Sequence, residues 1–212
     1  MKKYFVLALC LVTLNLPVAN ASQATYKDVQ TALNTLKVAD EVRTGYKRTL
    51  FKHWISAGNG CDSRKAVIIS EAIVKPTVEK GCVIKGGEWL SIYDNTKVTD
   101  AAKLDVDHMV PLAEAWDSGA SAWDAKKREV YANDQSDPRH LIAVTGASNR
   151  SKSDQDPAEW MPTNKAYTCE YIANWVSIKV RWALSVDAKE KTAITSYLKG
   201  CKATKIVVTP VA

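Results

Sequence analysis

Two short polar segments contain residues whose types could carry out hydrolysis. Asp107 and His108 lie side by side in LDVDHMVPL, and Asn149 opens NRSKSD. Carboxylate and carboxamide oxygens suit a hard cation such as Mg²⁺, which also coordinates phosphate, and Mn²⁺ would fit nearly as well. A histidine, with a reference pKa of about 6.5, can accept a proton from water at neutral pH. These residues predict phosphodiester hydrolysis, with Asp107 and Asn149 as metal ligands and His108 as general base.

The elements around these segments would have to bring them together. Leu104 and Val106 alternate with Asp105 and Asp107, which predicts a half-buried strand ending near His108. After a polar insertion over 113–139 with helical potential, HLIAV (140–144) predicts a second strand, TGAS a turn and NRSKSDQDPAEW the start of a helix. If the strands pair antiparallel and the helix packs across them, the two polar segments meet. Without the second segment, a surface turn with a salt link would explain the first equally well.

The N-terminus predicts export. Lys2 and Lys3 precede an apolar run, and Ala19-Asn20-Ala21 matches a cleavage site, so residues 1–21 read as a signal peptide. The run is shorter than the roughly 20 apolar residues of a membrane anchor, so we expect a secreted or periplasmic chain without membrane association after cleavage. The mature chain would carry 27 Lys and Arg against 23 Asp and Glu, a net charge of +4. This mild excess is compatible with a polyanionic substrate and equally with a solvated basic surface.

Four cysteines remain after cleavage, and an even count in an exported chain predicts two disulfides. Helical spacing from Cys169, a capping box formed by Asp187 and Glu190, and a stop at Gly200 predict two antiparallel helices that bring Cys201 beside Cys169. This pairing leaves Cys61 for Cys82. A zinc site is disfavoured because the CxxC spacing is absent.

The remaining pattern predicts an α+β fold in one domain over 22–212. Val29, Leu33 and Leu36 favour an N-terminal helix, and Asp62 could cap a second one. CVIK, a Gly86-Gly87 turn and EWLSIY favour a β-hairpin, with Asp94-Asn95 as the next turn. The candidate site would lie in a core over about 103–162, followed by the helical hairpin over about 165–201.

At DVDHMVP (105–111) and NRSKSD (149–154), the sequence resembles the HNH endonucleases of the His-Me finger (ββα-metal) superfamily. A similar plan occurs in exported bacterial HNH-type nucleases from about Gly45 to Cys201, including GYKRTLFKHW, NGCDSR, DHMVPLAEAW and DPAEWMP. The resemblance implies a disulfide-stapled ββα-metal core with flanking helices and a small hairpin. It places the general base at His108 and the metal ligands at Asp107 and Asn149, where Asn149 replaces the third signature residue, histidine.

The remaining candidate residues each have two interpretations. His140 occupies the middle signature position, often Asn, and would support the site, although a structural histidine explains it as well. Glu114 could contact the waters of the metal or be a solvated helix residue. The basic side chains of Arg150, Lys152 and Arg64 could bind phosphate oxygens or form ordinary surface contacts and salt bridges.

The sequence therefore predicts an exported, Mg²⁺-dependent endonuclease that cleaves DNA, with RNA as a second candidate substrate. Low sequence specificity is expected because no base-reading module is evident. The alternative is an exported protein for nucleic-acid binding or uptake that has kept the fold without catalysis. A secreted serine or cysteine hydrolase is disfavoured, because no GxSxG segment occurs and both disulfides would consume the cysteines.

Overall fold

The computed structural model describes residues 22–211, so the predicted signal peptide lies outside the described residues. The strands are β1 (Ala24–Tyr26), β2 (Ser56–Gly58), β3 (Cys61–Asp62), β4 (Thr77–Glu79), β5 (Val83–Lys85), β6 (Trp89–Ser91), β7 (Thr96–Val98), β8 (Leu104–His108), β9 (Leu141–Thr145) and β10 (Ile206–Val208). The α-helices are α1 (Val29–Leu33), α2 (Ser63–Ser70), α3 (Leu112–Asp117), α4 (Ala125–Ala132), α5 (Gly146–Lys152), α6 (Thr168–Arg181) and α7 (Ala188–Leu198). Short 3₁₀ helices are η1 (Arg48–Leu50), η2 (Ala101–Lys103), η3 (Ala120–Ala122) and η4 (Lys165–Tyr167). The strands form small antiparallel pairs, which confirms the α+β class.

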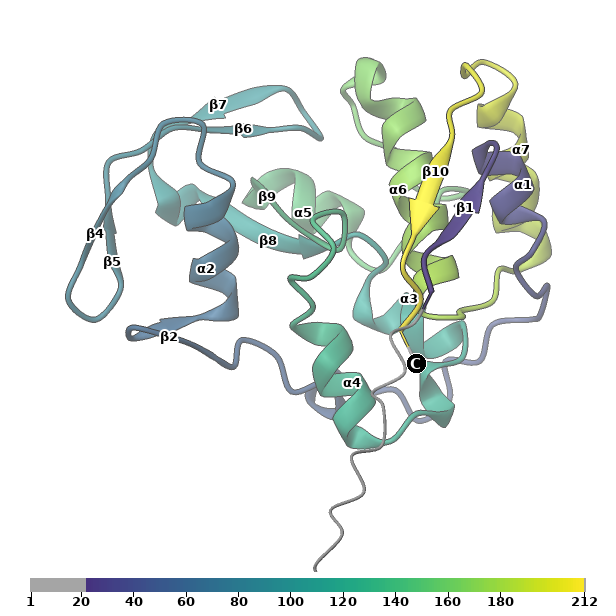
Figure 1. Ribbon diagram of the computed structural model, residues 1–212, viewed down its shortest axis with the longest axis horizontal. Helices are drawn as coiled ribbons and strands as arrows, with labels where there is room; N and C mark the ends of the chain where they lie inside the picture. Colours follow the sequence, from purple (N-terminus) through teal and green to yellow (C-terminus); the bar gives the residue numbers. More distant parts are fainter. Residues whose placement is uncertain (1–21, 212) are drawn as a thin grey trace, which may run out of the picture.

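The β8–β9 pair lies between the hairpins and α2 on one side of the molecule and α1, α6 and α7 on the other (Figure 1). Its register joins Asp107 to Ile142 and His108 to Leu141. Because side chains alternate along a strand, Leu104 and Val106 pack on one face with α2, whereas Ile142 contributes to the larger core around α6. The strand pair is therefore covered on both faces.

Helix α5 starts earlier than the sequence predicted. There is no turn at TGAS, because β9 runs to Thr145 and α5 begins at the next residue. Thr145 is the N-cap of α5, and its side-chain hydroxyl accepts a hydrogen bond from the Ser148 N–H. The helix ends at Lys152, before Pro157. A threonine N-cap satisfies a helix N–H without any intervening loop, so strand and helix join directly. Asn149 consequently lies in the middle of α5.

The predicted pairing across Gly86-Gly87 is wrong. β5 pairs with β4, and β6 pairs with β7 around the Asp94-Asn95 turn. The β4–β5 register continues to an isolated bridge between Val74 and Glu88, which places the two glycines opposite Lys75 and Pro76. Proline cannot donate a ladder hydrogen bond, so the strand pairing is interrupted there rather than reversed.

Other local predictions are confirmed. The Asp62 side chain caps α2 by accepting from the Lys65 N–H, and Asp187 and Glu190 form the capping box of α7. Disulfides join Cys61 to Cys82 and Cys169 to Cys201, the second linking α6 to the end of α7. Within residues 22–211, no helix combines the length and apolar character that crossing a bilayer requires.

Candidate active site

The end of β8 and one face of α5 border an open cleft with a volume of 530 Å³. Its lining includes Asp107, His108, Asn149 and Arg150, together with Arg48 from η1. The direct join between β9 and α5 places Asn149 over β8, although it is far from Asp107 in sequence. The cleft therefore brings together the three residues that the sequence singled out for hydrolysis.

His108 is held rigidly at the wall of the cleft. Its side chain lies against Trp54, with ring centroids 5.5 Å apart, and its Nε2 lies 2.9 Å from the carbonyl oxygen of Ala132. Because a carbonyl only accepts, Nε2 carries the proton in the neutral ring and Nδ1 presents the lone pair. Burial, reinforced by the nearby ring of His140, holds the pKa of His108 well below its usual value. The imidazole is thus neutral at neutral pH, and its Nδ1 carries no proton.

Asp107 is 5% exposed and is fixed by two donors. Its Oδ2 accepts hydrogen bonds from the Tyr93 hydroxyl at 2.6 Å and from Nζ of Lys152 at 2.7 Å. Lys152 is 0% exposed and also donates to the His108 carbonyl oxygen at 2.9 Å. This lysine binds the backbone and the carboxylate of the Asp-His pair at once.

Lys152 is therefore not placed to bind a phosphate group of a substrate in the cleft. The sequence placed it with Arg150 as a substrate-binding residue, but its ammonium group is buried beneath the cleft. Helical geometry explains the difference, because positions 150 and 152 are about 200° apart around α5. Arg150 faces the cleft with a side chain that is 75% exposed, and its closest acid is Asp105, at 3.9 Å.

Asn149 is oriented by Asp105, the other acid on the same face of β8. Its Nδ2 donates to Asp105 Oδ2 at 3.2 Å, which assigns the amide nitrogen to that side and leaves the amide oxygen for another partner. Among the described residues, Asp107 Oδ1 likewise has no hydrogen bond. One carboxylate oxygen and one amide oxygen on the same cleft are donors that fit a hard divalent cation.

His140 lies behind His108 rather than on the cleft. It is completely buried, and its Nε2 lies 2.7 Å from the carbonyl oxygen of Tyr131, next to the Ala132 carbonyl that binds His108. Burial lowers the pKa of His140 to about 4. The two imidazoles thus bind consecutive carbonyls at the end of α4, and this contact fixes the inserted helices against β8 and β9.

Two further candidates lie outside the cleft. Arg64, on α2, donates from Nη2 to the carbonyl oxygen of Leu104 at 2.6 Å, at the far end of β8 from His108. Glu114 is neither solvated nor directed at the cleft, since it is 2% exposed and its Oε1 accepts from Lys179 Nζ at 2.6 Å.

The sequence did not single out Tyr93, Trp54 or Arg48. Tyr93 ends a predicted strand and Trp54 adjoins a histidine, but no local pattern ties either of them to the Asp-His pair. Trp54 adopts a left-handed backbone conformation (φ 59°), which is uncommon for a bulky residue and which places its ring on His108. These contacts depend on chain segments that meet only in the folded protein.

Comparison with known proteins assigns the family. Residues 73–196 match the family model described as GmrSD restriction endonucleases, C-terminal domain. A protein of Arthroderma benhamiae, described as an uncharacterized secreted protein, is 41% identical over 157 residues, which cover 74% of this chain and 76% of that protein. No solved structure matches the chain significantly. The matched residues contain β8, β9 and α5, and the family points to a nuclease. The chain therefore belongs to the family of the C-terminal domain of GmrSD restriction endonucleases.

Proposed function

We propose that the protein is an exported, metal-dependent endonuclease of the HNH type that cleaves DNA with low sequence specificity. RNA is a second candidate substrate. One observation carries the proposal: Asp107, His108 and Asn149 line one cleft at the junction of two antiparallel strands and a helix. The nuclease family and the relative described as secreted support it from outside the site.

In this proposal, His108 takes a proton from the attacking water through Nδ1, because Nε2 is held by the Ala132 carbonyl. Its lowered pKa keeps the ring neutral, and the stacked Trp54 fixes its direction. Arg150 and Arg48 are exposed on the cleft and can hold phosphate oxygens.

Asp107 and Asn149 would hold one Mg²⁺, with Mn²⁺ as a substitute. When bound, the ion would stabilise negative charge on the phosphate in the transition state. Lys152 and Tyr93 position Asp107 for this role, since both donate to Oδ2 and leave Oδ1 on the other side of the carboxylate.

A second function, nucleic-acid binding without cleavage, is favoured by one feature. The Lys152 ammonium already neutralises Asp107 inside the protein, as it would in a site that had lost its metal. This alternative predicts salt-sensitive DNA binding and no cleavage.

A plasmid-nicking assay tests both. Residues 22–212 should nick supercoiled DNA in Mg²⁺ and stop in chelator, and His108→Ala should reduce the rate by about 10²- to 10⁴-fold. Gel-shift binding of the same DNA should survive in His108→Ala. Cleavage by a folded His108→Ala protein at the wild-type rate would refute the mechanism, and binding without nicking by the wild type would favour the alternative.

A further inference from the structure

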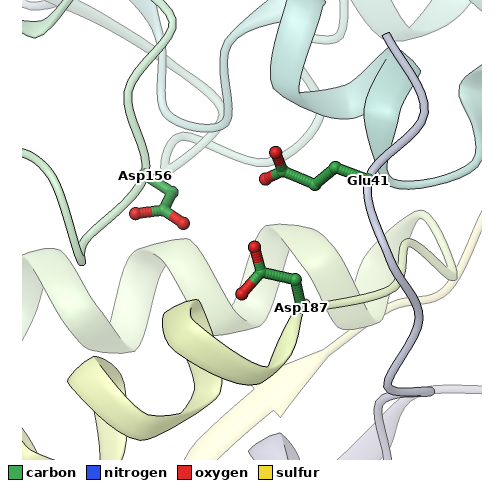
Figure 2. A group of neighbouring side chains, drawn as sticks. All are labelled: Glu41, Asp156 and Asp187. Atoms are coloured by element: carbon green, nitrogen blue, oxygen red, sulfur yellow. The ribbon is translucent and has the colours of Figure 1, made fainter.

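A second acidic group lies outside the cleft. Glu41, between α1 and η1, faces Asp156 and Asp187, and Figure 2 shows the three carboxylates pointing toward one another. One oxygen from each lies within 4.8 Å of the others, and Glu41 forms a second group of the same kind with Glu114 and Asp117. Oxygens on opposite sides of a Ca²⁺ ion are about 4.6 to 5.2 Å apart, because each bond measures about 2.3 to 2.6 Å. The spacing within each group fits a cation bound at Glu41.

Positive charge is scarce around this group. Arg43 pairs with Asp117, and Lys179 pairs with Glu114, but Glu41, Asp156 and Asp187 form no ion pair within residues 22–211. Loss of solvation and the neighbouring Glu114 carboxylate raise the pKa of Glu41 to about 8. A divalent cation would relieve the same repulsion that a proton relieves.

Asp117 independently indicates a ligand. Its side chain is 1% exposed, and its Oδ2 accepts from Arg43 at 2.6 Å. Its Oδ1 is buried and has no hydrogen-bond partner in the described part of the chain. Buried polar atoms are almost always satisfied, so an orphaned carboxylate oxygen beside other carboxylates suggests a missing cation.

The backbone holds Glu41 in this position. On one side, the Ala39 N–H donates to the carbonyl oxygen of Val186, next to Asp187, at 3.0 Å. On the other side, the Val42 N–H donates to the carbonyl oxygen of Asp117 at 3.3 Å. The backbone at Glu41 is therefore held between the segments that carry Asp187 and Asp117.

We propose that the two groups that share Glu41 bind one structural Ca²⁺ ion, through Glu41, Asp156 and Asp187 in the first group and Asp117 in the second. It would join the segment after α1 to the end of α3, the loop that follows α5 and the start of α7. Ca²⁺ suits the site because it accepts many carboxylate oxygens in irregular geometry, and extracellular sites bind it with dissociation constants of about 10⁻⁴ to 10⁻³ M. The site is separate from the candidate nuclease centre and does not depend on it.

Thermal unfolding of residues 22–212 tests the site. After treatment with chelator and dialysis, 5 mM CaCl₂ should raise the Tm by about 2 to 8 °C. The rise should disappear in a Glu41→Gln/Asp187→Asn protein, where Asn preserves the N-cap of α7. It should persist in Glu170→Gln, which removes an exposed acid of α6.

Asp107→Ala separates the two sites. The Ca²⁺-induced rise in Tm should persist in this variant, and equilibrium dialysis should find one Ca²⁺ per chain. Loss of the rise in Asp107→Ala with retention in the Glu41 variant would place the ion in the nuclease cleft and overturn the proposal. No bound Ca²⁺ in dialysis would overturn it equally, whether or not the substituted proteins fold.

Discussion

At the scale of single residues, the Asp-His pair depends on a lysine that substrate cannot reach. Lys152 is completely buried and binds both the Asp107 carboxylate and the His108 carbonyl. Burial alone lowers the pKa of Lys152, while the carboxylate of Asp107 opposes that shift. The charged pair is maintained because each partner compensates for the lost hydration of the other.

Replacing Lys152 should therefore cost far more than replacing a surface lysine. In Lys152→Met, Asp107 keeps its burial and loses its cation, so the free energy of unfolding should fall by about 3 to 5 kcal/mol in urea titrations. Lys126→Met, at an exposed lysine of α4, should change it by less than about 0.5 kcal/mol. Adding Asp107→Asn to Lys152→Met should recover part of the loss. Equal losses at the two lysines would contradict this account of the pair.

His140 gives a pH dependence of stability. Its pKa is about 4 in the folded protein and about 6.5 when unfolded, so only the unfolded state takes up a proton as the pH falls below 6.5. The histidine therefore lowers the free energy of unfolding progressively as the pH falls from about 6.5 to about 4. From pH 6.5 to 5 the free energy of unfolding should fall by about 1.5 kcal/mol.

The comparison with His140→Asn isolates this effect. Asparagine can still donate to the Tyr131 carbonyl but does not titrate. The stability difference between wild type and His140→Asn, measured in urea at pH 7 and pH 5, should shift toward the variant at pH 5. The same difference at both pH values would show that His140 titrates normally.

At the scale of elements, α5 decides whether Asn149 reaches the cleft. Its start is fixed by Thr145, whose hydroxyl both caps the helix and donates to Asp94 Oδ2 at 2.5 Å. Asp94 also accepts from Ser148 at 2.9 Å, so the β6–β7 turn supports the first turn of α5. The hairpin thus contributes to the site without lining it.

Thr145→Ala removes both hydroxyl contacts. We expect a loss of about 1 to 2 kcal/mol in the free energy of unfolding. Nicking should also slow, because Asn149 is less firmly placed. Thr145→Ser keeps the hydroxyl and should retain most of the stability and activity in the same urea and plasmid assays. A serine variant as damaged as the alanine variant would show that the methyl packing matters instead of the cap.

At the scale of the whole molecule, the modest net charge leaves nucleic-acid binding to local clusters. The predicted mature charge is only +4, but Arg48 and Arg150 are exposed on one cleft. Binding through such contacts releases counterions, so the affinity should fall as salt rises.

Arg150→Ala should weaken binding of short duplex DNA about equally for different sequences. In fluorescence anisotropy, it should reduce the slope of log affinity against log salt by about 1. Lys126→Ala, which removes an exposed lysine paired with Glu129, is the matched control and should leave the slope unchanged. An unchanged slope in Arg150→Ala would remove this residue from the phosphate contacts.

Local sequence patterns predicted most of the elements because their causes are local. Alternating apolar residues marked β8, a capping box marked α7, and cysteine spacing with helix lengths gave both disulfides. The hairpin pairing failed because Gly86-Gly87 resembles a turn in isolation. Its place opposite Pro76 is visible only once β4 is known to pair with β5.

The sequence by itself determined which side chains could meet at the end of β8. They are Asp107 and His108 at the end of one predicted strand and Asn149, which follows a second predicted strand. Only the tertiary structure decided how they are held. It buried Lys152 against Asp107, stacked Trp54 on His108 and directed Asn149 toward Asp105. It also gathered carboxylates from three distant segments around Glu41. Burial and long-range contacts set these partners, and neither is encoded in the spacing of neighbouring residues.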